Sequence, residues 1–423
     1  MKIQAPKGTR DILPSEIHRW QYVSRVFAGL CDSFGYKEIR IPVFEYTELF
    51  QRGVGDTTDI VQKEMYTFDD KGGRSVTLRP EGTAGVVRSY IENGMYSLPQ
   101  PIKLYYDITA YRYENVQKGR YREFHQFGVE AFGAAGSEID VEVISLLHMF
   151  FEKLRLKQTG LNINSIGCPA CRKAYHEKLK DFFRPHLSEL CNDCRNRFDK
   201  NPLRIIDCKN EECRKFIDGA PLLLDNLCDE CRNHFEGLRS GLDNLGINYA
   251  IDPKIVRGLD YYTRTVFEFV SENGGSQGTI CGGGRYDGLV EECGGPSVPG
   301  IGFALGVERL LMELDIQGVA IEEPPAPDIY IATMGQRAVD LAMQMVYKLR
   351  GHGVQAETDL MGRSLKAQMK YADKKRFSYT IAIGDDEIEA GKGVLKDMRT
   401  GDQKDVSLDS IVDRLKNQVN QAK

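Results

Sequence analysis

Apolar and polar positions alternate along two stretches of the chain, one before residue 112 and one after residue 122. A period of two is typical of β-strands with one buried face, and the first stretch places Leu104, Tyr106 and Ile108 together. Between the stretches, residues 115–121 are rich in Gln, Lys, Gly and Arg. We therefore predict an antiparallel hairpin with a long basic tip.

One face of this predicted hairpin carries side chains that do not make a hydrophobic core. They are Arg112, Glu114, Phe124, Gln126 and Glu130. A guanidinium, an aromatic ring, an amide and two carboxylates suit a ligand that carries both charges and phosphate groups. A salt-bridged, solvent-exposed hairpin is the alternative interpretation.

Apolar residues spaced by three and four positions predict helices before and after the hairpin. Residues 16–34 follow this spacing, and Gly35 is placed to end the helix. A helix over residues 138–155 is expected to open with a capping box formed by Ser137 and Asp140. The second of these helices has a wide apolar face and is expected to be structural.

A strand at residues 77–79 is followed by a helix that begins near Thr83, with Glu81 at its start. A carboxylate and a hydroxyl at this point can hold the ammonium group of a ligand. For an isolated glutamate, however, complementing the positive end of the helix dipole is the commoner role.

Glycines mark two segments where the backbone is expected to bend. Residues 52–68 are predicted to form a mobile loop able to close over a ligand, and residues 275–289 to turn through the glycines at 282–284 into a helix. Neither 282–287 nor 300–306 matches the dinucleotide fingerprint, and no Walker sequence is present. A nucleotide would therefore bind by a different kind of fold.

Residues 321–328 are rich in proline and acidic residues, which is typical of a linker. We place a domain boundary there, between residues 1–322 and 327–423. Beyond it, predicted strands and helices alternate, which indicates an α/β module. Four basic residues after Gly362 form a stripe at helical spacing, namely Arg363, Lys366, Lys370 and Lys374. Such a stripe can follow a phosphate backbone, or it can be a solvated helix face.

The composition is that of a globular protein with two or three domains. The chain has 423 residues, of which 41% are hydrophobic and 28% charged, and its net charge is −5. No apolar run reaches transmembrane length and the N-terminus is not a signal peptide, so we expect a cytoplasmic protein without membrane contact. A nucleic-acid partner would have to be met by a local basic surface.

Eight of the eleven cysteines lie in close pairs between residues 168 and 231. Three pairs have the C-x-x-C spacing of thiolate metal sites: Cys168 and Cys171, Cys191 and Cys194, Cys228 and Cys231. Two such pairs complete a closed tetrahedral zinc site. The wider pair, Cys208 and Cys213, fits this pattern less well. The alternative is a small helical subdomain with reduced thiols.

Several motifs resemble those of the class II aminoacyl-tRNA synthetases. Residues 105–130 are similar to motif 2, residues 36–50 to motif 1 and residues 299–314 to motif 3. TLRPEGTAG, RGLDYYTRTVFE and GGGRYDGL resemble the histidyl-tRNA synthetase family in particular. The resemblance covers essentially the whole chain. It implies an α+β fold with a class II antiparallel sheet flanked by helices, a helical insertion at about 168–245, a C-terminal α/β anticodon-binding domain and a homodimer.

The resemblance also implies a function and a set of site residues. L-histidine would be activated by ATP with Mg²⁺ to histidyl-adenylate and transferred to the 3′ end of tRNA(His). The catalytic residues would be Arg112 and Arg257. ATP would be held by Arg112, Glu114, Phe124 and Arg309. Histidine would be held by Glu81, Thr83, Gln126, Glu130, Tyr261 and Tyr262. The acceptor end of the tRNA would meet Gln117, Lys118 and Arg120.

Two other functions fit part of the pattern. The synthetase-like regulatory subunit of histidine biosynthesis shares the catalytic fold, but it generally lacks the C-terminal domain and has eroded motifs. The prolyl, threonyl or glycyl enzymes share the anticodon-binding domain, but RGLDYYTRT and GGGRYDGL argue against them. Because the histidines form no hydrolase or metalloprotease pattern, we expect catalysis by positioning and charge neutralisation rather than by a protein nucleophile.

Overall fold

The computed structural model of the protein describes residues 3–422 with the exception of 56–57, 59, 209 and 273–277. The chain forms two compact units, Met1–Ile321 and Glu322–Lys423. Each unit has its own hydrophobic core. Within the described residues, no helix combines the length and the apolar character needed to cross a membrane.

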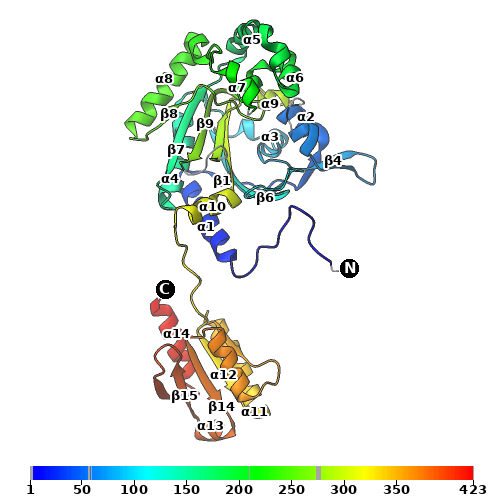
Figure 1. The fold of residues 1–423 in the computed structure, drawn as a ribbon. Coiled ribbons are helices and arrows are strands. Elements are labelled where there is room, and N and C mark those ends of the chain that lie inside the picture. The colour runs from blue at the N-terminus through cyan, green and yellow to red at the C-terminus, as the bar shows by residue number, and fades with distance from the viewer. Residues whose placement is uncertain (1–2, 56–57, 59, 209, 273–277, 423) are drawn as a thin grey trace. The chain divides into compact units, whose positions relative to one another are not determined.

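An eight-stranded sheet forms the centre of the first unit (Figure 1). Its inner strands pair antiparallel, whereas both edge strands run parallel to their neighbours. In order across the sheet the strands are β1 (Lys37–Glu38), β5 (Ile102–Tyr111), β6 (Glu123–Phe132), β11 (Gly300–Gly306), β10 (Thr279–Arg285), β9 (Thr263–Ser271), β7 (Thr159–Ser165) and β8 (Ala250–Ile251). The predicted hairpin is the antiparallel pair β5–β6, and the predicted antiparallel sheet is confirmed.

Helices α1 (Ile17–Ser33), α4 (Glu138–Lys153) and α10 (Val307–Ile316) pack on one face of this sheet. The ring of Phe27 in α1 stacks on that of Phe127 in β6, with 4.7 Å between the ring centroids. This contact shows that the helix predicted at 16–34 covers the sheet. It also confirms that Phe127 faces away from the proposed ligand side of β6.

Helix α4 begins at the predicted place, but the predicted capping box is wrong. Ser137 is the N-cap residue, yet its side chain makes no capping hydrogen bond. Asp140 is fully buried and accepts hydrogen bonds from Thr265, at 2.6 Å, and from Arg285. Asp140 therefore neutralises a buried arginine from a distant strand, a partner that the local pattern cannot reveal.

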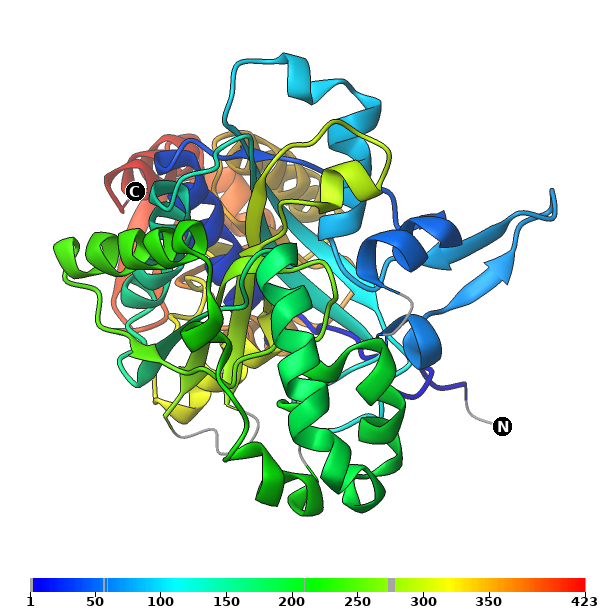
Figure 2. The same cartoon turned by 90° about the horizontal axis from the view of Figure 1, so that it is seen from above.

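The opposite face of the sheet holds helix α3 (Thr83–Glu92), with α2 (Thr47–Val54) beside it. Strands β2 (Phe44–Tyr46), β4 (Ser75–Leu78) and β3 (Thr67–Asp69) form a separate arm, which projects from the unit in Figure 2. The prediction of a loop at 52–68 is wrong for most of the described residues. This stretch contains the end of α2, a helical turn at Ile60–Glu64 and the start of β3. Part of that prediction, at 56–57 and 59, lies outside the described residues.

The glycines at 282–284 lie inside β10, so the predicted glycine turn is also wrong. Gly283 stands at the closest point between strands, where an added Cβ would lie 2.3 Å from the backbone oxygen of Gly302 on β11. A strand without side chains at this position lets its neighbours approach closely. The short helix α9 (Leu289–Glu292) follows only after the strand has ended.

Between β7 and β8 the chain forms a mostly helical insertion, drawn in green in Figures 1 and 2. Its helices are α5 (Pro169–Phe183), α6 (Asn192–Lys200), α7 (Glu211–Ile217) and α8 (Asp229–Asn244). Apolar residues of α5, such as Tyr175 and Leu179, belong to the same core as Tyr262 and Tyr286, which lie next to strands β9 and β10. The insertion is therefore packed onto the ligand face of the sheet and is not a detached appendage.

The second unit is a five-stranded mixed sheet with helices, as predicted for an α/β module. In order across the sheet its strands are β13 (Ala356–Thr358), β12 (Ile329–Thr333), β14 (Tyr379–Ile383), β15 (Lys392–Asp397) and β16 (Gln403–Ser407). The first three are parallel and the others antiparallel. Its helices are α11 (Gln336–Gly351), α12 (Leu365–Lys374), α13 (Asp385–Ala390) and α14 (Ile411–Ala422). The short α13 was not predicted.

The basic stripe in this unit is one residue shorter than predicted. Lys366, Lys370 and Lys374 are exposed on α12. Arg363 precedes the helix instead, with its guanidinium 4.5 Å from the ring centre of Tyr371 and 3.6 Å from Asp359. Arg363 therefore stabilises the loop before α12, and the three lysines remain as the surface able to follow a phosphate backbone.

Candidate active site

Glu130 is the centre of a cluster of buried polar side chains on the predicted ligand face of the sheet. It lies on β6 and is fully buried, with 0% of its surface exposed. Its Oε1 accepts hydrogen bonds from the hydroxyls of Thr83, at 2.7 Å, and Tyr106, at 3.2 Å. The Tyr286 hydroxyl donates to its Oε2. Thr83 begins helix α3, so the helix, both strands of the hairpin and the segment after β10 converge on one carboxyl group.

Burial raises the pKa of the Glu130 carboxyl to about 8, although hydrogen bonds from Tyr286 and Thr83 favour the charged form. The carboxyl therefore titrates near neutral pH. A buried group of this kind can pair with a hydrogen-bonding or cationic side chain of a ligand at little further desolvation cost.

Glu81 and Thr83 lie together at the start of α3, as the sequence indicated. The two oxygens of Glu81 accept hydrogen bonds from the backbone N–H groups of Thr83, at 2.7 Å, and Ala84, at 2.8 Å. Glu81 thus does stabilise the helix N-terminus, which was the alternative interpretation. Each carboxylate oxygen can accept more than one hydrogen bond, so an ammonium group can still bind there.

The remaining residues predicted for this end of the site are also buried. The rings of Tyr261 and Tyr262 lie against each other, with 4.7 Å between their centroids. Gln126 is buried on the same face of β6 as Glu130, and within the described part of the protein its Oε1 has no hydrogen-bond partner. A buried acceptor without a partner is costly, so it points to a ligand donor at this position.

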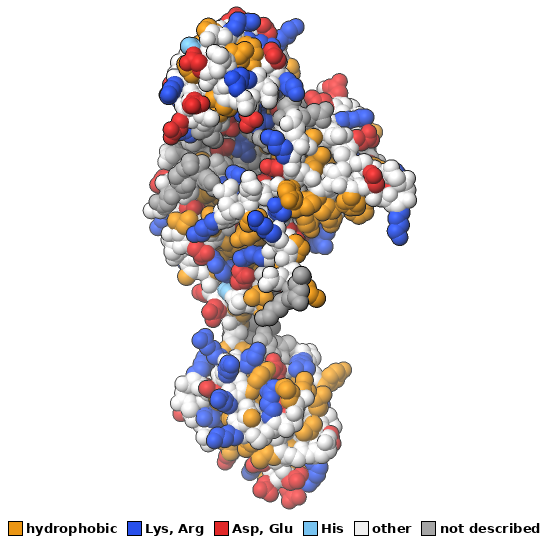
Figure 3. Space-filling model, turned by 45° about the vertical axis from the view of Figure 1, so that its right-hand side comes forward, with side chains coloured by type: hydrophobic (Ala, Val, Ile, Leu, Met, Phe, Trp, Pro, Cys, Tyr) orange, Lys and Arg blue, Asp and Glu red, His pale blue; other side chains and the backbone are white. Residues whose placement is uncertain are grey.

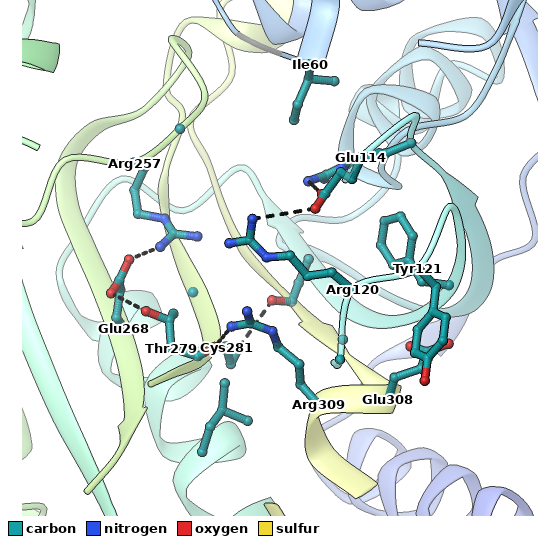
Figure 4. A pocket seen from close by; sticks show the side chains of 18 of the residues that line it. Ile60, Glu114, Arg120, Tyr121, Arg257, Glu268, Thr279, Cys281, Glu308 and Arg309 are labelled. Atoms are coloured by element: carbon teal, nitrogen blue, oxygen red, sulfur yellow. Dashed lines mark hydrogen bonds and ion pairs between the residues drawn. The ribbon is translucent and has the colours of Figure 1, made fainter. Parts of the chain in front are cut away.

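An open cavity of about 420 Å³ lies beside this cluster, since Arg257 and Arg112, which line it, interact with Tyr262 and Glu81 respectively. Arginines from different elements line the cavity. In Figure 4 the guanidinium groups of Arg120, Arg257 and Arg309 point into a common space. Arg112 lines the cavity too, and its Nε donates to the backbone oxygen of Pro80 at 2.8 Å. With Arg204, five arginines line this cavity, and such a group of guanidinium side chains is suited to bind a polyphosphate.

Each of these arginines is held by a neighbouring acceptor. Arg257 pairs with Glu268 of β9, and Arg309 donates to the backbone oxygen of Thr279 on β10. Arg120 in the hairpin tip lies 3.6 Å from Glu114. Such anchors hold the guanidinium groups in place before a ligand arrives, which is the arrangement expected of a preorganised electrostatic site.

Arg257 occupies the space above Gly282, which explains one of the glycines in the GGGRYDGL motif. A Cβ at Gly282 would lie 2.4 Å from the guanidinium carbon of Arg257. The glycine therefore makes room for a protein side chain rather than for a nucleotide backbone contact. Burial disfavours the charged form of Arg257, but attraction to Glu268 outweighs it and raises the pKa of the guanidinium above its ordinary value.

The hairpin residues predicted to hold a nucleotide lie at the open end of the strands. Arg112 and Glu114 come just after β5 rather than on it, and their charged groups are 3.8 Å apart. The guanidinium of Arg112 lies 5.4 Å from the ring centre of Phe124. Phe124 and Glu114 both line the cavity, so a flat base can lie beside the ring with a carboxylate within reach.

The hairpin tip reaches across the cavity towards α10. A Cβ on Gly119 would lie 3.3 Å from Met312 and 3.5 Å from Arg309, both on α10. Arg120 points into the cavity, whereas Lys118 borders a smaller hollow on the other side of the tip. Gln117 closes the tip through a bridge with Arg120. Of the three residues predicted to meet a tRNA end, only Arg120 lines the main cavity.

Sequence analysis missed four residues of the site. Tyr106 and Tyr286 bind Glu130, Glu268 pairs with Arg257, and Arg204 of the insertion lines the arginine cavity. Tyr286 and Glu268 lie within the quoted motifs, so their polar groups could have identified them as site residues. Tyr106 looks like a core residue, because it follows the alternation of apolar positions along the strand. Arg204 carried no signal, because only the fold brings the insertion to the cavity.

The eight close cysteines form two clusters of four sulfurs in the insertion. Cys168 and Cys171 meet Cys228 and Cys231, whereas Cys191 and Cys194 meet Cys208 and Cys213. Within each cluster all sulfurs lie within 4.8 Å of one another. Four thiolates around zinc at 2.3 Å are about 3.8 Å apart, so both clusters fit a tetrahedral ion. The wider pair 208/213 is therefore as suitable as the others, contrary to expectation.

Local backbone structure explains why these pairs suit a metal. Cys168, Cys191 and Cys228 are the N-cap residues of α5, α6 and α8, so the second cysteine of each C-x-x-C lies in the first helical turn. The backbone N–H of Cys228 donates to the sulfur of Cys171 at 3.1 Å, and that of Cys191 to the sulfur of Cys213 at 3.3 Å. N–H donors and helix N-termini both stabilise thiolates.

Comparison with known proteins relates both units to described families. The family model described as Histidyl-tRNA synthetase matches residues 8–170 and 212–310, and that described as Anticodon binding domain matches residues 328–418. The histidine–tRNA ligase of Acetivibrio thermocellus is similar at 69% identity, over 98% of this chain and 100% of its own length. That of Caldanaerobacter subterraneus is similar at 54% identity, over 99% and 100%.

Solved structures agree with this relationship. The structure of apo S. aureus histidyl-tRNA synthetase matches with a TM-score of 0.85 and 43% identity, over 98% of this chain and 100% of that one. A Bacillus halodurans protein, an ATP phosphoribosyltransferase regulatory subunit/histidyl-tRNA synthetase, matches at 22% identity and a TM-score of 0.61, over 91% and 99%, which indicates a shared fold alone. The chain therefore belongs to the histidyl-tRNA synthetase family.

Proposed function

We propose that this chain is a histidine–tRNA ligase that forms histidyl-adenylate from L-histidine and ATP and then transfers histidine to tRNA(His). One arrangement carries the proposal: the buried polar cluster around Glu130 lies beside a cavity lined by five arginines. The first suits a polar side chain that must be selected, and the second suits a triphosphate. Their adjacency is what a reaction between an amino acid and ATP requires.

The buried polar cluster would bind histidine. Glu130 and Tyr262 would take the two imidazole nitrogens, with Tyr261 packed beside them. Glu81, Thr83 and Gln126 would hold the ammonium and carboxylate groups, leaving the carboxylate directed towards the arginine cavity. The buried Gln126 Oε1 without a partner supports this assignment for a donor group.

The arginine cavity would bind ATP. Phe124 would stack on adenine, Glu114 would accept from its amino group, and Arg309 would hold the γ-phosphate. The histidine carboxylate would attack the α-phosphate in line, and the bond to the β-phosphate would break, releasing diphosphate. Arg112 and Arg257 would neutralise charge at the α-phosphate. The carboxylates Glu114 and Glu268 border the cavity, and Mg²⁺ carried in with ATP would supply further neutralisation of the phosphates.

The tRNA would be met at two places. Gln117, Lys118 and Arg120 in the hairpin tip would contact its acceptor end, and the second unit would bind the anticodon, with Lys366, Lys370 and Lys374 facing phosphates. We place the catalytic domain at residues 1–322 and the anticodon-binding domain at 327–423. Since tRNA charging takes place in the cytoplasm, we expect the protein to act there.

A truncated chain tests this division of labour. A chain ending at about Pro325 keeps every residue of the proposed active site, so it should form histidyl-adenylate at a normal rate. It should charge tRNA(His) far more slowly, because the anticodon contacts are missing. Adenylate formation by exchange and tRNA charging are measured side by side. Loss of adenylate formation on truncation would contradict the proposed boundary.

We also propose that each four-cysteine cluster holds one structural zinc ion. The geometry of the sulfurs and the N–H donors to Cys171 and Cys213 support this. Protein purified without chelator should contain about two zinc ions per chain, one for each set of four thiolates. Elemental analysis decides the point, and a metal-free protein with eight freely titratable thiols in the insertion would contradict it.

A homodimer is proposed from the arm that contains β2, β3 and β4. Val43, Phe44, Tyr46 and Phe68 are all exposed there, and Figure 3 shows apolar side chains gathered on the side where the arm projects. An apolar patch of this kind marks an interface, and the family resemblance makes a second copy the partner. Light scattering should give twice the 47.7 kDa chain mass. Phe44→Asp should reduce this to the single-chain mass.

A further inference from the structure

The segment 257–262 carries Arg257 at one end and Tyr262 at the other, so it connects the two halves of the active site. Between β8 and β9 it runs without regular strand or helix. Strand pairing therefore does not fix the backbone of this segment, although the Arg257 side chain pairs with Glu268 of β9, and other parts of the molecule must hold the rest. Within the described residues, side chains of the cysteine-rich insertion contact it at three points.

The first contacts come from the short segment between Cys194 and Cys208. The guanidinium of Arg204 donates to the backbone oxygen of Gly258 at 3.4 Å, and the amide of Asn201 donates to Asp260 at 3.0 Å. Arg204 is buried and lines the arginine cavity. These contacts hold the turn directly after Arg257.

The cluster that contains Cys191 flanks the stretch with Asn201 and Arg204 on both sides. Cys194 lies on helix α6, which ends just before Asn201, and Cys208 follows Arg204 by four residues. Cys208 itself borders a hollow that continues from the arginine cavity and shares Arg257 and Arg309 with it. A thiolate site here therefore lies next to the catalytic centre.

The remaining contact comes from the first cluster. Arg172 directly follows Cys171 on α5, and its guanidinium donates to the backbone oxygen of Tyr262 at 3.0 Å. Tyr262 belongs to the buried polar cluster around Glu130. Each cysteine cluster is thus next to the residue that supports one end of segment 257–262.

We infer that the insertion is a positioning element of the active site, in which the Cys191 cluster supports the phosphate end through Arg204 and the Cys168 cluster supports the histidine end through Arg172. This inference rests on the proposed function. Part of the insertion, residues 171–211, lies outside the family-model matches, so Arg172 and Arg204 are features of this chain that the family model does not include.

Variants of Arg204 and Arg172 test the two proposed contacts while the cysteine clusters stay unchanged. Arg204→Ala should lower kcat for histidine-dependent ATP–diphosphate exchange by roughly 10–100-fold, because small displacements of a catalytic group have effects of this size. Its KM for histidine should stay the same. Arg172→Ala should raise the KM for histidine by about tenfold, the loss expected for one charge-assisted hydrogen bond, and leave kcat nearly unchanged. Arg204→Lys, which keeps a donor, should recover part of the loss.

Arg195→Ala is the matched control, since this arginine of α6 bonds only to Ser188 and Asn192 among the contacts of the described residues, both within the insertion. It should leave kcat and KM unchanged. Thermal unfolding of all variants should coincide with that of the wild type. The inference would be overturned if Arg204→Ala and Arg172→Ala changed kcat and the KM for histidine in the same way. It would also be overturned if neither variant changed either constant.

Cysteine variants connect the clusters to these effects. Cys208→Ser should remove about one zinc ion per chain and reproduce the kcat loss, whereas Cys231→Ser should remove the other ion and reproduce the KM increase. Zinc loss without either kinetic change would overturn the link between the clusters and the site. The wild type separates this test from the proposed function: if it does not exchange diphosphate with histidine, the function fails, whereas normal wild-type exchange with unaffected arginine variants refutes only the positioning role.

Discussion

The two ends of the proposed active site, the proposed histidine end and the proposed phosphate end, differ in the burial and the charge of their side chains. At the histidine end, Glu130, Tyr106 and Tyr286 are at most 1% exposed and are joined by hydrogen bonds. At the phosphate end, the charged side chains of Arg112, Arg257 and Arg120 are 19%, 21% and 46% exposed. The first end is buried and has a carboxyl group with a raised pKa, whereas the second is open and is lined by five arginines and four glutamates.

This difference matches two separate tasks. A closed polar pocket rejects a wrong side chain strongly, because its buried groups would be left without partners. An open cationic cavity instead receives a large, highly charged ligand and stabilises charge as it moves along the phosphates. At each end a glycine leaves space for a charged side chain. Gly282 makes room for Arg257, and a Cβ on Gly302 would collide with Glu130. Selection and catalysis are therefore separable by mutation.

The largest effect is expected at Arg257. Arg257→Ala should lower kcat for adenylate formation by about 10²–10³-fold, the cost typical of losing one preorganised group that stabilises transition-state charge. The KM for histidine should hardly change, since the buried polar cluster is intact. Diphosphate exchange measures both constants. Near-normal kcat would show that Arg257 has no catalytic role.

Gly282→Ala approaches the same question without deleting the arginine. The added Cβ would overlap the guanidinium of Arg257 and displace it, so kcat should fall while the charge remains. Gly29→Ala in helix α1 is the matched control, because no atom lies within 4 Å of its added Cβ. An equal loss from both glycine variants would indicate a general packing defect.

The next effect concerns the buried end. Glu130→Gln keeps the shape of the side chain but replaces a titratable carboxyl group with an amide, whose NH₂ group cannot accept a hydrogen bond, so the KM for histidine should rise by about 10–100-fold. The KM for ATP should stay within about twofold, because Glu130 does not line the arginine cavity. Kinetics at saturating concentrations of the second substrate separate the two constants. Parallel increases in both would show that the ends are not independent.

A smaller effect is expected from Arg309→Lys. Lysine keeps the charge but loses the planar fork that can hold a phosphate with two hydrogen bonds. The KM for ATP should therefore rise by about tenfold, the equivalent of one lost charge-assisted bond. The KM for histidine should not respond. If only the KM for histidine changed, Arg309 would contact histidine rather than ATP, and the proposed role would be wrong.

The smallest effect is on stability against pH. The raised pKa of Glu130, about 8 against an ordinary 4.5, means that the folded protein binds a proton more tightly than the unfolded chain. The stabilisation of the folded state by this tighter proton binding is fully present below about pH 4.5 and is lost as the pH rises through about 8. The melting temperature of the wild type should therefore decline relative to that of Glu130→Gln across this range, by only a few degrees in so large a unit. A constant difference would refute the shifted pKa.

Sequence patterns anticipated the parts of the molecule that follow a regular period. Helix α1, the β5–β6 hairpin and the α/β second unit follow from local alternation and spacing. Motif resemblance brought Glu81, Glu130 and Arg257 to one site. Local patterns failed where the partner is distant in sequence: Asp140 binds Arg285 instead of capping its helix, and the pair Cys208 and Cys213 completes a cluster with Cys191 and Cys194. Arg204 became visible only in the fold.

The most direct test of the central claim is ATP–diphosphate exchange by the purified full-length chain, measured with each of the twenty amino acids in turn. The account predicts exchange with histidine and none above background with proline, threonine or glycine, because only an imidazole satisfies the buried Glu130 pocket. Exchange that depends on another amino acid, or no exchange with histidine, would contradict it.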